Sequence, residues 1–239
     1  MALITGIEGK SEVQLEVDRT FLAARIAARP LDYASEGRVL GHYAVAQRSG
    51  ELAATIGALG HLAAIRWADS TAYCVLMRVK AGWSISAAVT TAVQMNLRAV
   101  LARAFSVDFT TAVTRASMTV PSKANAMRNS MGSSLMGLNG PMISTTTVMS
   151  GQTLTADTLG FGFGVWPGIL STNGTGTAVV MNLGVAGPMQ TLYEYTALQQ
   201  HPVVLSTNEG VIIQPITAGP ASGTFAVYAQ WEWAEVEVY

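Results

Sequence analysis

The last strand-like segment of the chain alternates between apolar and polar side chains, which is the period of a half-buried β-strand. One side of this segment carries Phe225, Val227, Ala229, Trp231 and Trp233, and the other carries Tyr228, Gln230 and Glu232. The phase then changes, because Val236 and Val238 occupy even positions. We therefore expect a β-bulge near Ala234.

Two earlier segments show the same alternation. In residues 73–83, one face carries Tyr73, Val75, Met77, Val79, Ala81 and Trp83. In residues 94–109, one face carries Met95, Leu97, Ala99, Leu101, Phe105, Val107 and Phe109. Arg103 interrupts this second face, and the segment is long for one strand, where about five or six residues are usual. We therefore expect a kink near Ala102–Arg103.

Turn-forming residues separate these strands, at 206–210 and again at 217–223. Residues 131–187 are rich in Gly, Ser, Thr and Asn, which predicts a loop-rich insertion with short strands. The one helical segment that the pattern suggests, Pro121–Arg128, is short and begins with proline. Many strands with almost no helix predict an all-β protein, with a sandwich, a jelly roll and a barrel as the architectures.

The N-terminal segment Glu12–Asp18 also alternates, and it precedes Arg29-Pro30, whose proline favours an extended chain. It is either an ordinary first strand or part of an extended arm over residues 1–30 that pairs with another element. In the second case residues 31–239 form the β domain. The arm residues that we expect at an interface are Val13, Leu15, Val17, Arg25 and Arg29.

Charged residues are scarce, at 12% of the chain against about 25% in a typical soluble domain. Half of the chain is hydrophobic, which excludes intrinsic disorder, and the low charge favours a chain that packs into an assembly. All 14 Lys and Arg residues lie between Lys10 and Arg128, so the two halves of the sequence have opposite charge. Opposite halves would attract one another in head-to-tail packing, unless folding mixes the charges in space. The net charge of −1 predicts no general affinity for nucleic acid.

The single cysteine, Cys74, forms no intrachain disulfide, which fits a reducing cytosol. The first residues do not have the pattern of a secretion signal, and no run of about 18 apolar residues predicts a membrane span.

Chemically reactive residues do not form a recognisable motif. His42, His61 and His201 are scattered, without the spacing of a metal site. We interpret Glu235 and Glu237 as the solvated face of an edge strand rather than as a catalytic pair. We therefore expect no enzymatic activity, no bound metal and no cofactor.

Several short motifs occur along most of the chain. They are Glu16-Val17-Asp18, Ala28-Arg29-Pro30, Gly41-His42-Tyr43, Ser49–Ala54, Ile65-Arg66-Trp67, Ala102–Phe105, Arg128–Leu135, His201–Leu205, Asn208-Glu209-Gly210 and Trp231–Glu235. Their order and spacing resemble a group of structural proteins encoded in tailed-bacteriophage and prophage genomes. The resemblance implies a virion component on the head with a jelly-roll-like β-sandwich, and it implies no catalytic residues.

These observations predict a capsid decoration or cement protein, assembled in the host bacterial cytoplasm. Its expected partners are the major capsid protein or other virion subunits and further copies of itself, with no membrane involved. Trp231 and Trp233 would then be either interface anchors or core residues. One alternative is a shell-forming capsid protein. The other is a receptor- or glycan-binding module of a fibre, with Phe161, Phe163, Trp166 and Tyr193 as contact residues in the loops.

Overall fold

Strands dominate the described part of the chain, which a computed structural model gives for residues 39–53, 56–87, 95–118, 132–165, 186–196, 201–219 and 222–237. The strands are β1 (Val39–Arg48), β2 (Leu52–Ala53), β3 (Ala63–Trp67), β4 (Tyr73–Ala87), β5 (Leu97–Val107), β6 (Val113–Arg115), β7 (Met142–Ser144), β8 (Thr153–Ala156), β9 (Gly162–Gly164), β10 (Ala186–Glu194), β11 (Val203–Leu205), β12 (Glu209–Pro215) and β13 (Thr224–Val236). A short 3₁₀ helix, η1, covers Gly137–Asn139. The predicted arm residues 1–30, the predicted helix 121–128 and Trp166 lie outside the described residues.

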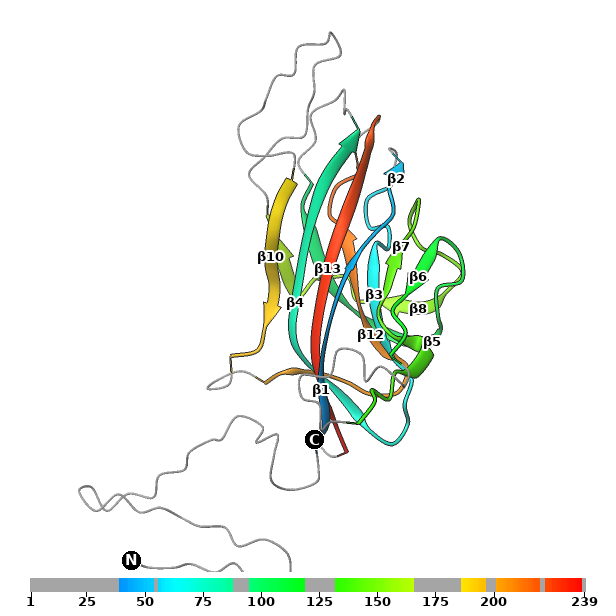
Figure 1. Cartoon of the computed structure of the whole chain (residues 1–239), viewed down its shortest axis with the longest axis vertical. Helices are drawn as coiled ribbons and strands as arrows, with labels where there is room; N and C mark the ends of the chain where they lie inside the picture. The colour runs from blue at the N-terminus through cyan, green and yellow to red at the C-terminus, as the bar shows by residue number, and fades with distance from the viewer. Residues whose placement is uncertain are drawn as a thin grey trace, which may run out of the picture.

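Two antiparallel sheets pack face to face. The six-stranded sheet has the order β1-β13-β4-β10, with β11 also on β4 and β2 on β13. The seven-stranded sheet has the order β6-β7-β3-β12-β5-β8, with β9 also on β5. In Figure 1, β10, β4 and β13 lie side by side in the front layer. The prediction of an all-β sandwich is confirmed.

One set of pairings is nested along the chain. The first described strand, β1, pairs with the last, β13, and β3 pairs with β12. Further inward, β4 pairs with β10, and β5 pairs with β8 and β9. These nested pairs lie alternately in the two sheets, and the pairings of β4 with β13 and of β5 with β12 join them within each sheet.

The space between the sheets is filled by large side chains from both. Trp231 and Trp233 of β13, Trp83 of β4 and Trp67 of β3 belong to the same buried cluster, and all four are 2% exposed or less. Val, Tyr, Phe and Trp are the residue types that suit a pleated, half-buried surface, which explains why β4 and β13 form the longest strands. Burying a large apolar side chain stabilises the fold by roughly 1.5–3 kcal/mol.

The faces of β4 differ from the prediction. Met77 is an extra residue in the pairing with β13, since Glu232 opposes Arg78 and Trp233 opposes Leu76. This bulge changes which side chains point inward, so Cys74 and Leu76 join Val79, Ala81 and Trp83 in the core. Val75 and Met77 instead pack on the outer face with Ala234 and Val236. The prediction that Tyr73, Val75 and Met77 share a face with Trp83 is therefore wrong.

The bulge expected near Ala234 lies on the neighbouring strands instead, at Met77 of β4 and between Val39 and Gly41 of β1. The alternation of apolar and polar side chains breaks at the end of β13 because both faces of the strand are buried there. β13 is also an interior strand between β1 and β4, so the interpretation of Glu235 and Glu237 as an edge strand is wrong.

The kink expected in the long segment 94–109 is present. The pairing of β5 with β8 becomes irregular after Arg103, and Ala104 has a positive φ of 49°. Beyond this point Phe105 and Phe109 pack on the outer face of the seven-stranded sheet, with Ala64, Met149 and Ile212. The prediction that the two phenylalanines share a face with Leu97 and Ala99 is therefore wrong, because the left-handed residue turns the chain over.

Arg66 of β3 binds the segment that follows Ala104, from Phe105 to Asp108. Its guanidinium donates to the carbonyls of Phe105 and Ser106, to Asp108 Oδ1 at 3.0 Å and to Asn208 Oδ1 at 2.9 Å. The side chain is 13% exposed, so these hydrogen bonds are shielded from water. A planar group with several donors satisfies all these acceptors at once, which an ammonium group does not.

We predict that Arg66→Lys lowers the free energy of unfolding by about 2 to 4 kcal/mol, because acceptors near Phe105 lose a charged donor. Urea denaturation measures this change. The matched control is Arg103→Lys, whose side chain is 55% exposed and pairs with Asp157 and Glu209. This control should cost about 0 to 1 kcal/mol. Equal effects of the two substitutions would contradict the role given to Arg66.

Candidate functional site

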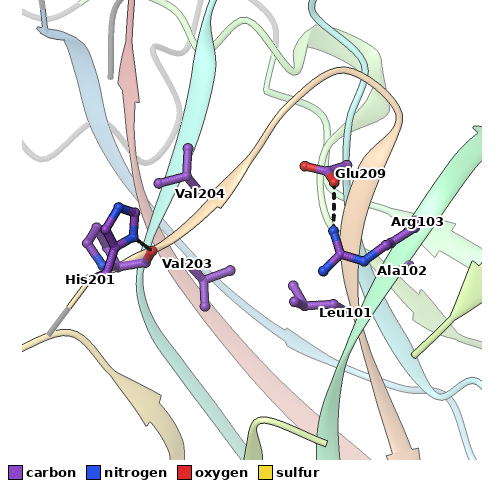
Figure 2. A pocket seen from close by; sticks show the side chains of 8 residues that line it. Leu101, Ala102, Arg103, His201, Val203, Val204 and Glu209 are labelled. Atoms are coloured by element: carbon purple, nitrogen blue, oxygen red, sulfur yellow. Dashed lines mark hydrogen bonds and ion pairs between the residues drawn. The ribbon is translucent and has the colours of Figure 1, made fainter. Parts of the chain in front are cut away.

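A pocket opens where β5 and β11 diverge, with a volume of about 300 Å³. It is lined by Leu101, Ala102, Arg103, His201, Pro202, Val203, Val204 and Glu209. Figure 2 shows Arg103 of β5 facing Glu209 of β12, with His201 and Val203 on the β11 side. The walls are therefore mostly apolar, with one ion pair at the rim.

The polar groups of this pocket already have partners. Arg103 Nη1 lies 3.1 Å from Glu209 Oε1, and the other carboxylate oxygen of Glu209 accepts from the amide and hydroxyl of Ser206. His201 Nδ1 lies 3.0 Å from the carbonyl oxygen of Pro202. The arrangement can hold a small apolar group beside an ion pair.

A row of charges crosses the outer face of the six-stranded sheet. Glu232 of β13 accepts from Arg78 of β4 at 2.9 Å, and its other oxygen lies 3.1 Å from His42 Nε2 of β1. Arg78 also lies 3.5 Å from Glu194 of β10. Both carboxylates lie within ion-pair distance of Arg78, and the row connects four adjacent strands.

Among the described residues, Glu235 is the one carboxylate that is buried, and it is 0% exposed. Its carboxylate accepts hydrogen bonds from Ser134 Oγ at 2.5 Å, from the Leu135 amide at 2.9 Å and from Trp233 Nε1 at 3.1 Å. It thereby ties the turn before η1 to the end of β13. Burial raises the pKa of Glu235 above its ordinary value, although these hydrogen bonds oppose the shift.

Two neighbours of Glu235 also have raised pKa values. Burial, together with the Glu235 charge, raises the pKa of Tyr43 to about 12, and the Tyr43 hydroxyl donates to the Gly132 carbonyl at 2.9 Å. Burial raises the pKa of the Cys74 thiol well above its usual range. A buried thiol that stays protonated is unreactive, so this group of residues supports the structure.

Two of the aromatic residues predicted as loop contacts, Phe161 and Tyr193, are in contact with each other. Phe161 and Tyr193 of β10 meet edge to face, with ring centroids 5.4 Å apart, and both are partly buried. Phe163 of β9 points outward and is 54% exposed. The two flanking glycines, Gly162 and Gly164, are buried. A Cβ on Gly162 would lie 2.0 Å from the Leu192 carbonyl oxygen, so β9 lies directly against β10.

Trp231 and Trp233 are placed differently. Both are 0% exposed between the sheets, so they have no surface to offer a partner. The interface role is therefore corrected to a core role for these two residues. The structure does not describe the remaining interface candidates, Val13, Leu15, Val17, Arg25 and Arg29, or the loop candidate Trp166.

The three histidines lie on different elements. His42 belongs to β1, His61 packs against the Phe109 ring at 5.2 Å, and His201 precedes β11. Burial lowers the pKa of His61. Within the described ranges, no group of three or more His, Cys, Asp and Glu side chains is arranged to hold a metal ion. In the same part of the chain, no helix has the length and apolar character to cross a membrane.

The sequence did not reveal that Glu235 is buried or that Arg98 donates only to neutral oxygens among the described residues. The signal for Glu235 was the change of apolar phase around Ala234, which marks a strand that is buried on both faces. Arg98 of β5 opposes Phe163 in the pairing with β9, and a pairing between such distant residues is not readable from the sequence.

Comparison with family models, with curated proteins and with solved structures found no match to this chain. The resemblance to phage structural proteins therefore stays a prediction.

Glu235 generates a pH prediction. Because its pKa is raised in the folded chain, folding favours the protonated form. Its stabilising contribution is complete below about pH 4.5, the ordinary value, and is lost as the pH rises through the raised pKa. Relative to Glu235→Gln, the wild-type chain should therefore lose stability as the pH rises from 4.5.

Urea denaturation of both proteins across this pH range measures the difference. Glu237→Gln is the matched control, since Glu237 is exposed and follows on the same segment. It should leave the pH profile unchanged. Parallel profiles for wild type and Glu235→Gln would contradict the raised pKa.

Proposed function

We propose that this chain is a structural component of a bacteriophage virion, a capsid decoration or cement protein that binds the head lattice. The observation that carries the proposal is the order of the strands. We infer that the nested pairing of β1 with β13, β3 with β12, β4 with β10, and β5 with β8 and β9 is that of a jelly roll. This fold occurs in viral capsid domains and in lectins.

The surface gives a second reason. Leu159, Phe163 and Val165 are 81%, 54% and 56% exposed and lie within seven residues of one another at β9. Apolar side chains gathered at one place on a surface are typical of a protein interaction site. With 12% charged residues, the chain also has little charge to keep it apart from neighbouring subunits. Both properties favour a protein that works in an assembly, where many weak contacts on a lattice add in avidity.

A receptor- or glycan-binding module is the second candidate, because lectins share the jelly roll and because the pocket beside Arg103 has room for a small group. A shell-forming capsid protein is the remaining alternative. The three functions differ in copy number and in what the isolated chain does, so one set of measurements separates them.

We predict hundreds of copies of the chain per particle, in a simple ratio to the major capsid protein. Quantitative mass spectrometry of particles purified from the phage or induced prophage that encodes the chain measures this number. A handful of copies, with binding on a glycan array, would replace the proposal by the receptor-binding function. Closed shells of the purified chain alone, in electron micrographs, would replace it by the shell-forming function. Absence from the particles would overturn a virion role.

A further inference from the structure

Arg98 of β5 differs from most of the basic residues that the structure describes. Arg66, Arg78, Arg103 and Arg115 each lie within 4 Å of a carboxylate oxygen. Arg98 makes no such contact within the described ranges. Its guanidinium donates only to neutral oxygens, the Thr158 carbonyl at 3.2 Å and the Gln214 side chain at 3.1 Å. Its Nε atom is buried without a hydrogen-bond partner in the same part of the chain. The two hydrogen bonds hold a positive charge in a fixed place without neutralising it.

Exposed apolar side chains surround this charge. Phe163 lies directly opposite Arg98 in the pairing of β9 with β5, on the outer face of the seven-stranded sheet. Val165 follows two residues later, so it extends the same side of the chain. Leu159 follows Thr158, and a Cβ on Gly160 would lie 3.3 Å from both the Arg98 Cβ and the Phe163 ring. We name Arg98, Leu159, Phe163 and Val165 the β9 patch.

The β9 patch is rigid in its backbone. β9 is paired with β5 on one side, and Gly162 lies against the Leu192 carbonyl of β10 on the other. Gln190 of β10 also donates to the Val165 carbonyl at 2.8 Å. Arginine and aromatic side chains, phenylalanine included, are enriched at protein interfaces relative to the rest of the surface.

The other large surfaces described in the structure do not combine these properties. Phe105, Phe109 and Met149 cover part of the outer face of the seven-stranded sheet. On the six-stranded sheet, Arg78 lies within ion-pair distance of the carboxylates of Glu232 and Glu194, so its charge already has partners.

We propose that residues 12–18 of a second copy of the chain bind the β9 patch. This inference rests on the proposed function as an assembly protein and names the contact between its subunits. The segment Glu12–Asp18 alternates Val13, Leu15 and Val17 with polar residues, and three of these polar residues are the carboxylates Glu12, Glu16 and Asp18. Apolar residues spaced by two would meet Phe163 and Val165, which have the same spacing. A carboxylate from the segment would supply the partner that Arg98 lacks.

The length of the chain permits this contact. About 20 residues separate Asp18 from Val39, where β1 begins, and an extended chain of that length reaches roughly 70 Å. The segment of one copy can therefore reach the surface of a neighbour.

Photo-cross-linking in the full chain tests the contact directly. Phe163 is replaced by p-benzoylphenylalanine, which keeps an aromatic ring at the position. Labelled ¹⁵N chains and unlabelled chains are mixed before irradiation. Trypsin, which cleaves after Lys10 and Arg19, then releases the segment as the peptide Ser11–Arg19. We expect cross-links from position 163 to this peptide that join a labelled chain to an unlabelled one.

The matched control places the same probe at Leu138 of η1, which is 69% exposed. It should give no cross-link to residues 11–19. Cross-links from position 163 only within one chain would overturn the proposal in favour of a contact within the copy. Cross-links to any other peptide, or to none, would also overturn it.

Charge reversal provides the second test. Arg98→Glu should lower the yield of the cross-link by about tenfold, which corresponds to the loss of one charge-assisted contact. Combining Arg98→Glu with Glu12→Lys, Glu16→Lys and Asp18→Lys should restore most of the yield. For these variants the yield is measured as cross-linked dimer on a denaturing gel, because the new lysines divide the tryptic peptide. Lys80→Glu on the six-stranded sheet is the control and should leave the yield unchanged. Arg98→Gln, which removes the charge but keeps a polar side chain, gives the same test if Arg98→Glu does not fold.

The two proposals fail separately. Lattice-level copy number without the cross-link would leave the cement function in place and remove the β9 patch as its contact. The cross-link in a chain that is absent from virions would keep the contact between copies and remove the virion role.

Discussion

The fold depends on one strand, β13, which is hydrogen-bonded along both edges and buries its tryptophans between the sheets. β13 pairs with β1 along one edge and with β4 along the other, while Trp231 and Trp233 fill the space between the sheets. At its end the opposite face is buried as well, by Val75 of β4 against Ala234. A strand with both edges paired and both faces covered has no freedom of register, because a shift of one residue would move every tryptophan to the wrong side. The neighbouring strands therefore accommodate the misfit, through the bulges at Met77 and between Val39 and Gly41.

The two outer faces of the sandwich carry different kinds of side chains, ion pairs on the six-stranded sheet and a partly covered apolar surface on the seven-stranded sheet. The six-stranded sheet carries Arg78 paired with the carboxylates of Glu232 and Glu194 on its neighbouring strands. The seven-stranded sheet is covered on one part by its own chain, which Arg66 holds in place by binding backbone carbonyls. Among the described residues, the same sheet near β9 has an arginine without a carboxylate partner and apolar side chains that are exposed. This difference makes the β9 patch a surface that is suited to a partner.

The sequence predicted the all-β class and the positions of the three longest strands, β4, β5 and β13, because an alternating pattern depends only on local geometry. It failed where a single residue changes the phase. Met77 in the bulge and the left-handed Ala104 each moved the following side chains to another face. Nothing in the local composition indicated the bulge at Met77, and the interruption by Arg103 indicated a kink without showing that the next side chains change face. The surroundings of Glu235 and Arg98 were also unreadable, because they depend on which distant segments lie alongside. The tryptophans of β13 illustrate the remaining ambiguity, since a strip of aromatic residues predicts burial without saying whether the cover is the same chain or another.

The nesting of the strands also has a consequence for how the chain is made. Val39, near the start of β1, is opposed by Val236, near the end of β13, so the outermost pair joins segments at opposite ends of the sequence. During synthesis the edge of β1 that pairs with β13 stays unpaired until β13 has left the ribosome. Closing so long a loop is slow, since the entropy has to be lost before the contact is gained. The six-stranded sheet is therefore completed only when β13 emerges, and until then the nascent chain depends on its surroundings to keep β1 from pairing with the wrong strand.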